Sequence, residues 1–140
     1  IKGKGAYLLS VFIKVLTYKP KYVELQLDDK KIKTKILLAA FCNGNSYGGG
    51  MLVNPEGSLT DGLLDVILID PVPRYKIILL LSKFIKGKHL SLPYVTTHKC
   101  REIKVTSEEP MAVNVDGECP ITTPVVLGIS PMSIRVIGGI

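Results

Sequence analysis

Three short segments of this 140-residue chain carry residues whose types and spacing could support chemistry. The last of them, residues 113–118, reads Val-Asn-Val-Asp-Gly-Glu and places the carboxylates of Asp116 and Glu118 two positions apart. A carboxylate presented at a turn can accept the proton of an attacking hydroxyl group. An Asp-Gly pair is equally typical of a two-residue hairpin turn, because both residues adopt positive φ readily. The local sequence leaves both interpretations open.

The middle segment, residues 58–65, reads Ser-Leu-Thr-Asp-Gly-Leu-Leu-Asp. One interpretation is a turn at Asp61 and Gly62 that leads into a buried strand. The other is a site for a hard cation, since Mg2+ takes oxygen ligands from one or two carboxylates, carbonyl groups and water. A calcium EF-hand is excluded because the spacing of acidic residues that it requires is missing.

The first segment, residues 43–51, is a glycine-rich loop whose backbone amides could hold a phosphate. It lacks the residue order of a P-loop and that of a dinucleotide fingerprint. His89 and His98 lie nine positions apart with no third metal ligand near them in the sequence, which favours structural or surface roles over catalysis or zinc binding. No Ser or Cys lies in a nucleophile elbow.

These segments must be positioned by a fold that the sequence predicts to be mainly β. Apolar residues at helical spacing predict helices over residues 6–16 and 75–86, the second from Ile77, Ile78, Leu81, Phe84 and Ile85. Alternating or apolar runs between turn residues predict strands over 22–27, 30–40, 66–69, 100–106, 112–115, 125–129 and 133–137. We therefore expect a single domain over residues 1–140, an antiparallel two-layer β-sandwich with two flanking helices.

The bulk composition narrows the class of partner. A net charge of +6 and a pI near 9.2 favour an anionic partner, namely nucleic acid, an acidic membrane surface or a phosphorylated ligand. Nucleic acid is disfavoured, since the chain has no Trp and no basic stripe interleaved with aromatic residues. Three cysteines without a CxxC pair favour a reducing cytoplasm. The apolar run at 77–81 is far shorter than the ~18 residues of a membrane span.

The order of the motifs resembles the diacylglycerol kinase-like lipid kinase family. That family includes bacterial diacylglycerol and phosphatidylglycerol kinases and, more distantly, sphingosine and ceramide kinases. The resemblance covers about residues 20–137, and it rests on five pieces in sequence: 43–51, Pro55, 59–66, 86–89 and 115–118.

The resemblance implies that this chain is the C-terminal β-sandwich domain of a two-domain lipid kinase. In that family a first α/β domain carries a Gly-Gly-Asp-Gly-Thr nucleotide signature, which this sequence lacks. ATP would then be bound mainly by an absent N-terminal nucleotide-binding domain, and the isolated chain would be inactive. The parent protein would be a cytoplasmic enzyme, peripherally associated with the membrane, that transfers the γ-phosphoryl group of ATP to a lipid hydroxyl, with diacylglycerol as the expected acceptor. The resemblance implies no nucleic-acid partner and leaves a homo-oligomer open.

The resemblance also assigns roles to particular residues. Glu118 would be the catalytic base on the lipid hydroxyl, with Asp116 a contributor or a competing candidate. A magnesium ion would be held by the Asp61 side chain and by the main-chain carbonyl groups of Ser58 and Leu63.

Two further interpretations compete with the lipid kinase. One is a NAD kinase-like domain that acts on a soluble nucleotide, and the other is a non-catalytic β-sandwich binding module. Lys83, Lys86 and Lys88 are candidates for contact with an anionic bilayer, where a basic residue contributes roughly 1 kcal/mol. A solvated helix face explains the same three lysines without a membrane.

Overall fold

A computed structural model of the chain describes residues 10, 13–14, 16–46, 51–116 and 118–133. Within these residues, antiparallel strands form three sheets with the orders β2-β1-β6-β9, β3-β4-β5 and β7-β8. The strands are β1 (Lys21–Leu27), β2 (Lys30–Ile36), β3 (Leu38–Cys42), β4 (Leu64–Ile69), β5 (Val95–Cys100), β6 (Glu102–Ser107), β7 (Ala112–Val115), β8 (Glu118–Thr122) and β9 (Val125–Gly128). The helical elements with defined bounds are α2 (Arg74–Ile85) and the short 3-10 helix η1 (His89–Ser91).

The four-stranded and three-stranded sheets face each other across one apolar core. β1 shows the underlying pattern, because its alternating sequence buries Val23, Leu25 and Leu27 and turns the residues between them outward. These side chains pack with residues of the three-stranded sheet, among them Leu64, Val66, Leu68 and Cys100. The prediction of a mainly β, antiparallel fold is therefore confirmed.

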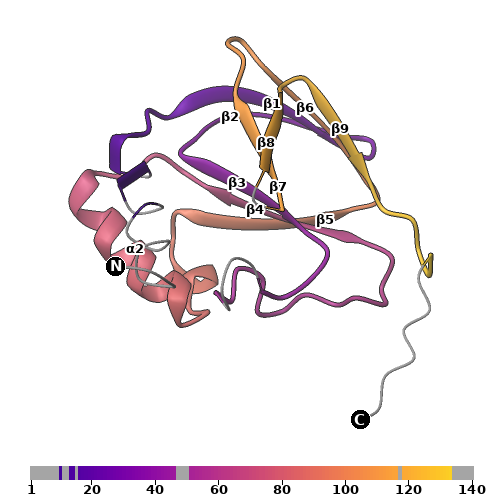
Figure 1. Cartoon of the computed structure of the whole chain (residues 1–140), viewed down its shortest axis with the longest axis horizontal. Coiled ribbons are helices and arrows are strands. Elements are labelled where there is room, and N and C mark those ends of the chain that lie inside the picture. The colour runs from indigo at the N-terminus through magenta and orange to yellow at the C-terminus, as the bar shows by residue number, and fades with distance from the viewer. Residues whose placement is uncertain (1–9, 11–12, 15, 47–50, 117, 134–140) are drawn as a thin grey trace.

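β4 is the central strand, buried along its whole length on both faces. Val66 and its alternate neighbours enter the core between the sheets, whereas Ile67 and Ile69 enter a second core on the opposite face. α2 closes this second core with Ile77 and Leu80. Figure 1 shows α2 against the three-stranded sheet, on the side away from the four-stranded sheet. In the described ranges, no helix has both the length and the apolarity needed to cross a bilayer.

The predicted strand over residues 30–40 is wrong, because this segment forms two strands in different sheets. β2 alternates lysines with half-buried residues and is the edge strand of the four-stranded sheet. The chain bends at Leu37, whose N–H donates to the carbonyl of Ile69 at 2.7 Å, and β3 then pairs with β4. The bend carries the chain from one layer of the sandwich to the other.

The prediction of two flanking helices is met by one helix with defined bounds, α2, among the residues that the structure describes. The first predicted helix, residues 6–16, lies mostly outside the described residues. The predicted strand at 133–137 also lies outside them, apart from Ser133.

Two further strands differ from the sequence prediction. Residues 95–100 form β5, which the sequence pattern missed, and the next strand begins at Glu102 rather than at Cys100. The Asp28 side chain ties the β1–β2 turn to the β5–β6 connection, because its Oδ1 accepts the N–H groups of Arg101 at 3.1 Å and Glu102 at 3.0 Å. This contact spans more than 70 positions of sequence, so local patterns could not reveal it.

Candidate functional site

Asp116 and Glu118 lie at the tip of the β7–β8 hairpin. β7 ends at Val115 and β8 begins at Glu118, and Asp116, directly after β7, has a φ of 49°. Gly117, the second residue of the predicted Asp-Gly turn, lies outside the described residues. A hairpin at this position is confirmed, because β7 and β8 pair as antiparallel strands on either side of the turn. Asp116 and Glu118 are exposed, and in the described part of the chain neither carboxylate forms a hydrogen bond or an ion pair. A turn therefore presents two unpaired carboxylates to solvent, which leaves the catalytic interpretation intact.

The hairpin is held against the sandwich at its base. The Thr123 hydroxyl accepts the N–H of Met111 at 2.9 Å and forms a second hydrogen bond with the hydroxyl of Ser107. Met111 and Val113 pack against the core between the sheets. The register between β7 and β8 shifts between Val113 and Val115, so two residues of β8 oppose one of β7. The tip is thus carried on an anchored, bulged ribbon rather than on a long loop.

The Asp61 loop folds around its own carboxylate. Asp61 Oδ1 accepts the N–H of Leu63 at 3.1 Å, and Gly62 between them has a φ of 68°. The hydroxyl of Ser58 accepts the N–H of Thr60 at 3.3 Å. These local bonds close a compact turn around the Asp61 carboxylate. A carboxylate is one of the oxygen ligands that Mg2+ prefers.

The ammonium of Lys99, on β5, joins the two carboxylates that flank this loop. Lys99 Nζ lies 2.8 Å from Asp61 Oδ2 and 3.2 Å from Asp65 Oδ1. The other oxygen of Asp65, Oδ2, accepts a hydrogen bond from Asn54 Nδ2 at 2.8 Å. Asp65 is nearly buried, yet its charge is compensated because both of its oxygens have a partner.

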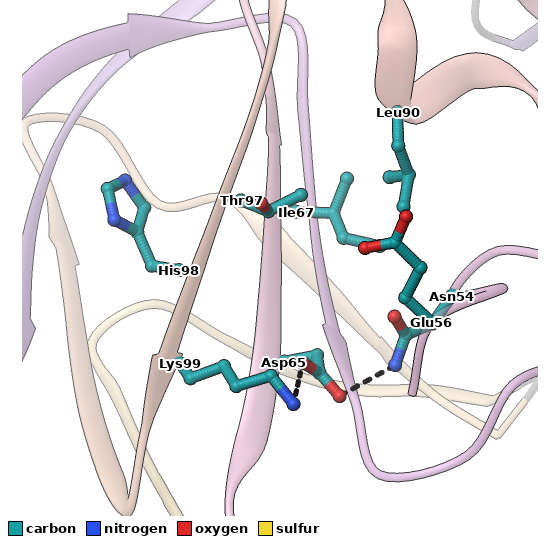
Figure 2. Close-up of a pocket in the computed structure, with 8 residues that line it drawn as sticks. All are labelled: Asn54, Glu56, Asp65, Ile67, Leu90, Thr97, His98 and Lys99. Atoms are coloured by element: carbon teal, nitrogen blue, oxygen red, sulfur yellow. Dashed lines mark hydrogen bonds and ion pairs between the residues drawn. The ribbon is translucent and has the colours of Figure 1, made fainter. Parts of the chain in front are cut away.

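Asn54, Asp65 and Lys99 line a cavity of about 200 Å³ beside the three-stranded sheet. Figure 2 shows Asp65, Lys99 and Asn54 linked along one side, with Thr97 and Ile67 near the centre and Leu90 from η1 opposite. The His98 side chain lies on the other side of β5 from those of Thr97 and Lys99.

The ion pair fixes the charge states of the Asp61 loop. The Lys99 ammonium beside Asp61 holds the pKa of that carboxyl below its ordinary value, and the hydrogen bond from Leu63 adds to the effect. The pKa of Lys99 is raised, first by Asp61 and then by Asp65. Asp61 is therefore ionised at neutral pH, as a magnesium ligand must be. Both oxygens of the Asp61 carboxylate have a partner in the described residues, Oδ1 the N–H of Leu63 and Oδ2 the ammonium of Lys99.

The two halves of the predicted site are not bonded to each other. In the part of the chain that the structure describes, no hydrogen bond or ion pair joins Asp61, Ser58 or Leu63 to the hairpin tip. The sequence analysis missed Lys99 and Asn54. The pairing of Asp65 with Lys99 is a cross-strand contact between β4 and β5, and only the register of these strands reveals it.

Other reactive side chains are placed where they cannot act as nucleophiles or acid–base groups. Burial raises the pKa of the Cys42 thiol to about 11, so it stays protonated at neutral pH. His89 is fully buried, stacks on Phe84 at 4.1 Å and forms a 2.8 Å hydrogen bond to the Val53 carbonyl. Burial lowers the pKa of His89. The structural role predicted for this histidine is confirmed.

Replacing Lys99 with Met should lower the thermal unfolding midpoint near pH 7, because Asp65 would be left nearly buried beside Asp61 without a cation. The pKa of Asp61 is lower in the folded protein than its ordinary value of 3.8. The contribution of the Lys99–Asp61 pair to stability is therefore fully present above pH 3.8, and it is lost as the pH falls through the pKa of Asp61 in the folded protein. The pKa of Lys99 is higher in the folded protein than its ordinary value of 10.5. The same contribution is therefore fully present below pH 10.5, and it is lost as the pH rises through the pKa of Lys99 in the folded protein. The difference between wild type and variant should therefore be largest between these limits.

Thermal melts over a pH series would measure this difference. Lys31→Met is the matched control, since Lys31 is an exposed lysine at the start of the edge strand β2. A Lys99→Met variant that differed from wild type no more than the control at pH 7 would contradict the bridging role of Lys99.

Comparison with known proteins places this architecture in a family. Residues 1–138 match the family model described as the YegS C-terminal NAD kinase beta sandwich-like domain. A diacylglycerol kinase of Mycobacterium tuberculosis (strain CDC 1551 / Oshkosh) is 30% identical over 96% of this chain and 44% of its own length. A diacylglycerol kinase of Bacillus subtilis (strain 168) is 28% identical over 83% of this chain and 38% of its own length.

Solved structures agree on the fold. A crystal structure from Bacillus anthracis str. Sterne superposes with a TM-score of 0.69 at 24% identity, over 89% of this chain and 42% of that one. The chain thus spans about two fifths of the length of the curated relatives that it matches. Because the family model matches nearly the whole sequence, the chain belongs to the family of YegS C-terminal NAD kinase beta sandwich-like domains, which is the C-terminal β-sandwich of diacylglycerol kinase-like lipid kinases.

Proposed function

We propose that this chain is the substrate-side domain of an ATP- and magnesium-dependent lipid kinase that phosphorylates diacylglycerol. The observation that carries the proposal is the alignment of 138 residues with a diacylglycerol kinase at 30% identity. The exposed, unpaired carboxylates at the hairpin tip supply the chemistry that such a reaction needs. ATP would be bound mainly by an N-terminal nucleotide-binding domain of the same cytoplasmic protein.

In this proposal Glu118 is the base. Its carboxylate accepts the proton of the lipid hydroxyl as the hydroxyl oxygen attacks the γ-phosphorus of ATP in line, and ADP leaves. Asp116, one turn residue away, holds negative charge beside Glu118 and is the competing candidate for the same role. The anchored ribbon limits the positions that both carboxylates can reach, which is what a proton acceptor within hydrogen-bond distance of its substrate requires.

The magnesium ion would be held by the Asp61 carboxylate and the carbonyl oxygens of Ser58 and Leu63. When bound, it would supply positive charge that offsets the negative charge of phosphate groups. Lys99 places a positive charge 2.8 Å from Oδ2 of the same carboxylate. Asp65 and Asn54 hold Lys99 in place, so these three residues position the loop rather than touch the reacting atoms.

The function is tested by assaying the parent protein for phosphate transfer from ATP to diacylglycerol, phosphatidylglycerol and sphingosine in vesicles. NAD serves as the soluble acceptor, because the family description also names NAD kinase. Transfer to diacylglycerol above the other acceptors supports the proposal. Transfer to NAD alone would favour the soluble-substrate kinase, and transfer to none of them would favour a binding module.

Magnesium should raise the thermal unfolding midpoint of wild type, because an ion that binds only the folded state stabilises it by mass action, about 2.7 kcal/mol at one hundred times the dissociation constant. Asp61→Asn should abolish this increment. The increment is the quantity to compare, since Asp61→Asn also weakens the pairing with Lys99 and lowers the midpoint without metal. Differential scanning calorimetry with and without magnesium measures it, with Asp29→Asn as an exposed control on the β1–β2 turn. An increment that survives in Asp61→Asn would rule out this magnesium site.

A further inference from the structure

One face of α2 carries an exposed apolar stripe. The exposed fractions are 70% for Tyr75, 59% for Ile78, 49% for Leu79 and 44% for Ile85. These positions follow a spacing of three, four and seven residues, which places them on one side of a helix. The opposite side is in the second core through Ile77 and Leu80. The described residues therefore leave the apolar side chains of this stripe exposed to water.

Basic residues border this stripe. Arg74, Lys76 and Lys86 are exposed, and Lys83 lies in the last turn of α2. Residues 71–101 contain seven Lys or Arg and no Asp or Glu, whereas the rest of the chain has one more acidic residue than basic. The net charge of +6 thus arises from the segment that builds α2, η1 and β5.

The combination of an apolar stripe with basic flanks is typical of a helix that lies in the plane of a membrane interface. Such a helix inserts its apolar side chains among lipid headgroups, while the lysine and arginine stems extend toward the phosphates. A protein partner fits this face less well, because the cores of protein interfaces are depleted in lysine. The lack of acidic residues over residues 71–101 removes the local repulsion that would oppose an anionic bilayer.

We infer that the exposed face of α2 is a docking surface for the anionic lipid bilayer, which holds the domain at the membrane through Tyr75, Ile78, Leu79 and Ile85 together with the flanking Lys83 and Lys86. The inference rests on the proposed lipid kinase function for the biological role of membrane binding. The binding itself is argued from the exposed apolar residues and the charge of this face. It adds to that function a defined surface, separate from the hairpin tip and from the Asp61 loop.

Two double variants test the two components of the surface in the parent protein and in the 140-residue chain. Ile78→Ser with Leu79→Ser removes apolar area, and Lys83→Glu with Lys86→Glu reverses charge. Lys86 caps the C-terminal end of α2, the other three residues lie on it, and none of the four is among its buried positions. Binding is measured by co-sedimentation with vesicles of phosphatidylglycerol and phosphatidylcholine and with vesicles of phosphatidylcholine alone. We expect Lys83→Glu with Lys86→Glu to weaken binding to the anionic vesicles by at least about tenfold, since each basic residue near an anionic surface contributes to binding. Ile78→Ser with Leu79→Ser should weaken binding by a similar factor, since the binding of an interfacial helix scales with its buried apolar area.

Matched controls separate a local surface from a general effect. Lys30→Glu with Lys31→Glu changes the net charge by the same amount on the edge strand β2 of the other sheet layer. Val126→Ser removes an apolar side chain that is 60% exposed on β9. Both controls should bind like wild type, and circular dichroism melts check that every variant folds.

The outcomes distinguish the docking surface from the kinase proposal. Loss of vesicle binding in both α2 variants, with phosphorylation of diacylglycerol retained in neutral detergent micelles, supports docking and kinase together. Loss of binding in a parent protein that phosphorylates no lipid supports docking and overturns the kinase. Unchanged binding in both α2 variants, or equal loss in the matched controls, overturns docking. Binding by the 140-residue chain but not by the parent would also overturn it, because another part of the protein would then cover α2.

Discussion

Glu118→Gln in the parent protein should reduce phosphorylation of diacylglycerol by about 100-fold to 10,000-fold, the range that a positioned general base contributes. The amide keeps the size of the side chain but cannot accept the proton of the lipid hydroxyl. The Glu118 side chain is exposed, and its carboxylate forms no hydrogen bond or ion pair with the described residues, so the thermal unfolding midpoint should stay at the wild-type value. Initial rates with saturating ATP, measured beside a melt, test both statements.

Asp116→Asn is the matched control for this experiment. Asn tolerates positive φ nearly as well as Asp, so the turn at φ 49° should keep its shape while one carboxylate is lost. If Glu118 is the base, Asp116→Asn should retain much more activity than Glu118→Gln. The reverse order would assign the proton transfer to Asp116, and near-normal rates in both variants would remove the hairpin tip from the mechanism.

Ile67→Ala should lower the free energy of unfolding by about 2 to 5 kcal/mol, the range for deleting a large buried aliphatic side chain. Ile67 is 1% exposed and lies in the second core, between the central strand β4 and α2. The lost side chain leaves a cavity that the two rigid elements cannot close without shifting toward each other. Urea unfolding followed by circular dichroism measures the change.

The exposed Val126 on β9 provides the comparison for Ile67. Val126→Ala removes apolar surface that is already 60% in water, so it should cost less than about 1 kcal/mol. Similar losses in the two variants would mean that β4 is not buried on its helical face, which would contradict the two-core arrangement.

The hairpin tip shows what local sequence can determine. Asp116 has a positive φ, and an Asp-Gly pair is a local sequence signal for a hairpin turn that needs no distant contact to be recognised. The Asp61 turn is similar, because its carboxylate bonds to the N–H of Leu63 only two positions away. The alternation of apolar and polar residues in β1 is visible in the sequence, so the β class could be predicted. The order of the five motifs is visible as well, so the family could be predicted.

The Lys99 network shows what local sequence cannot determine. Asp65 and Lys99 meet because β4 and β5 pair in one particular register, across an intervening segment that contains α2 and η1. The same long-range pairing creates β5, which has no distinctive alternation of its own. The bend at Leu37 also depends on a long-range contact, because the residues after it pair with β4 in the three-stranded sheet.

By itself, the sequence determined the antiparallel β class, the turns that present Asp61, Asp116 and Glu118, and the family of the chain, because these depend on short-range backbone preferences and motif order. The tertiary structure alone decided which face of α2 is buried. The sequence analysis grouped Ile78 and Ile85 with Ile77, yet Ile78 and Ile85 are exposed. A helix that is apolar on nearly every side has no periodicity that selects its core face, so the packing of Ile77 and Leu80 against β4 makes that choice.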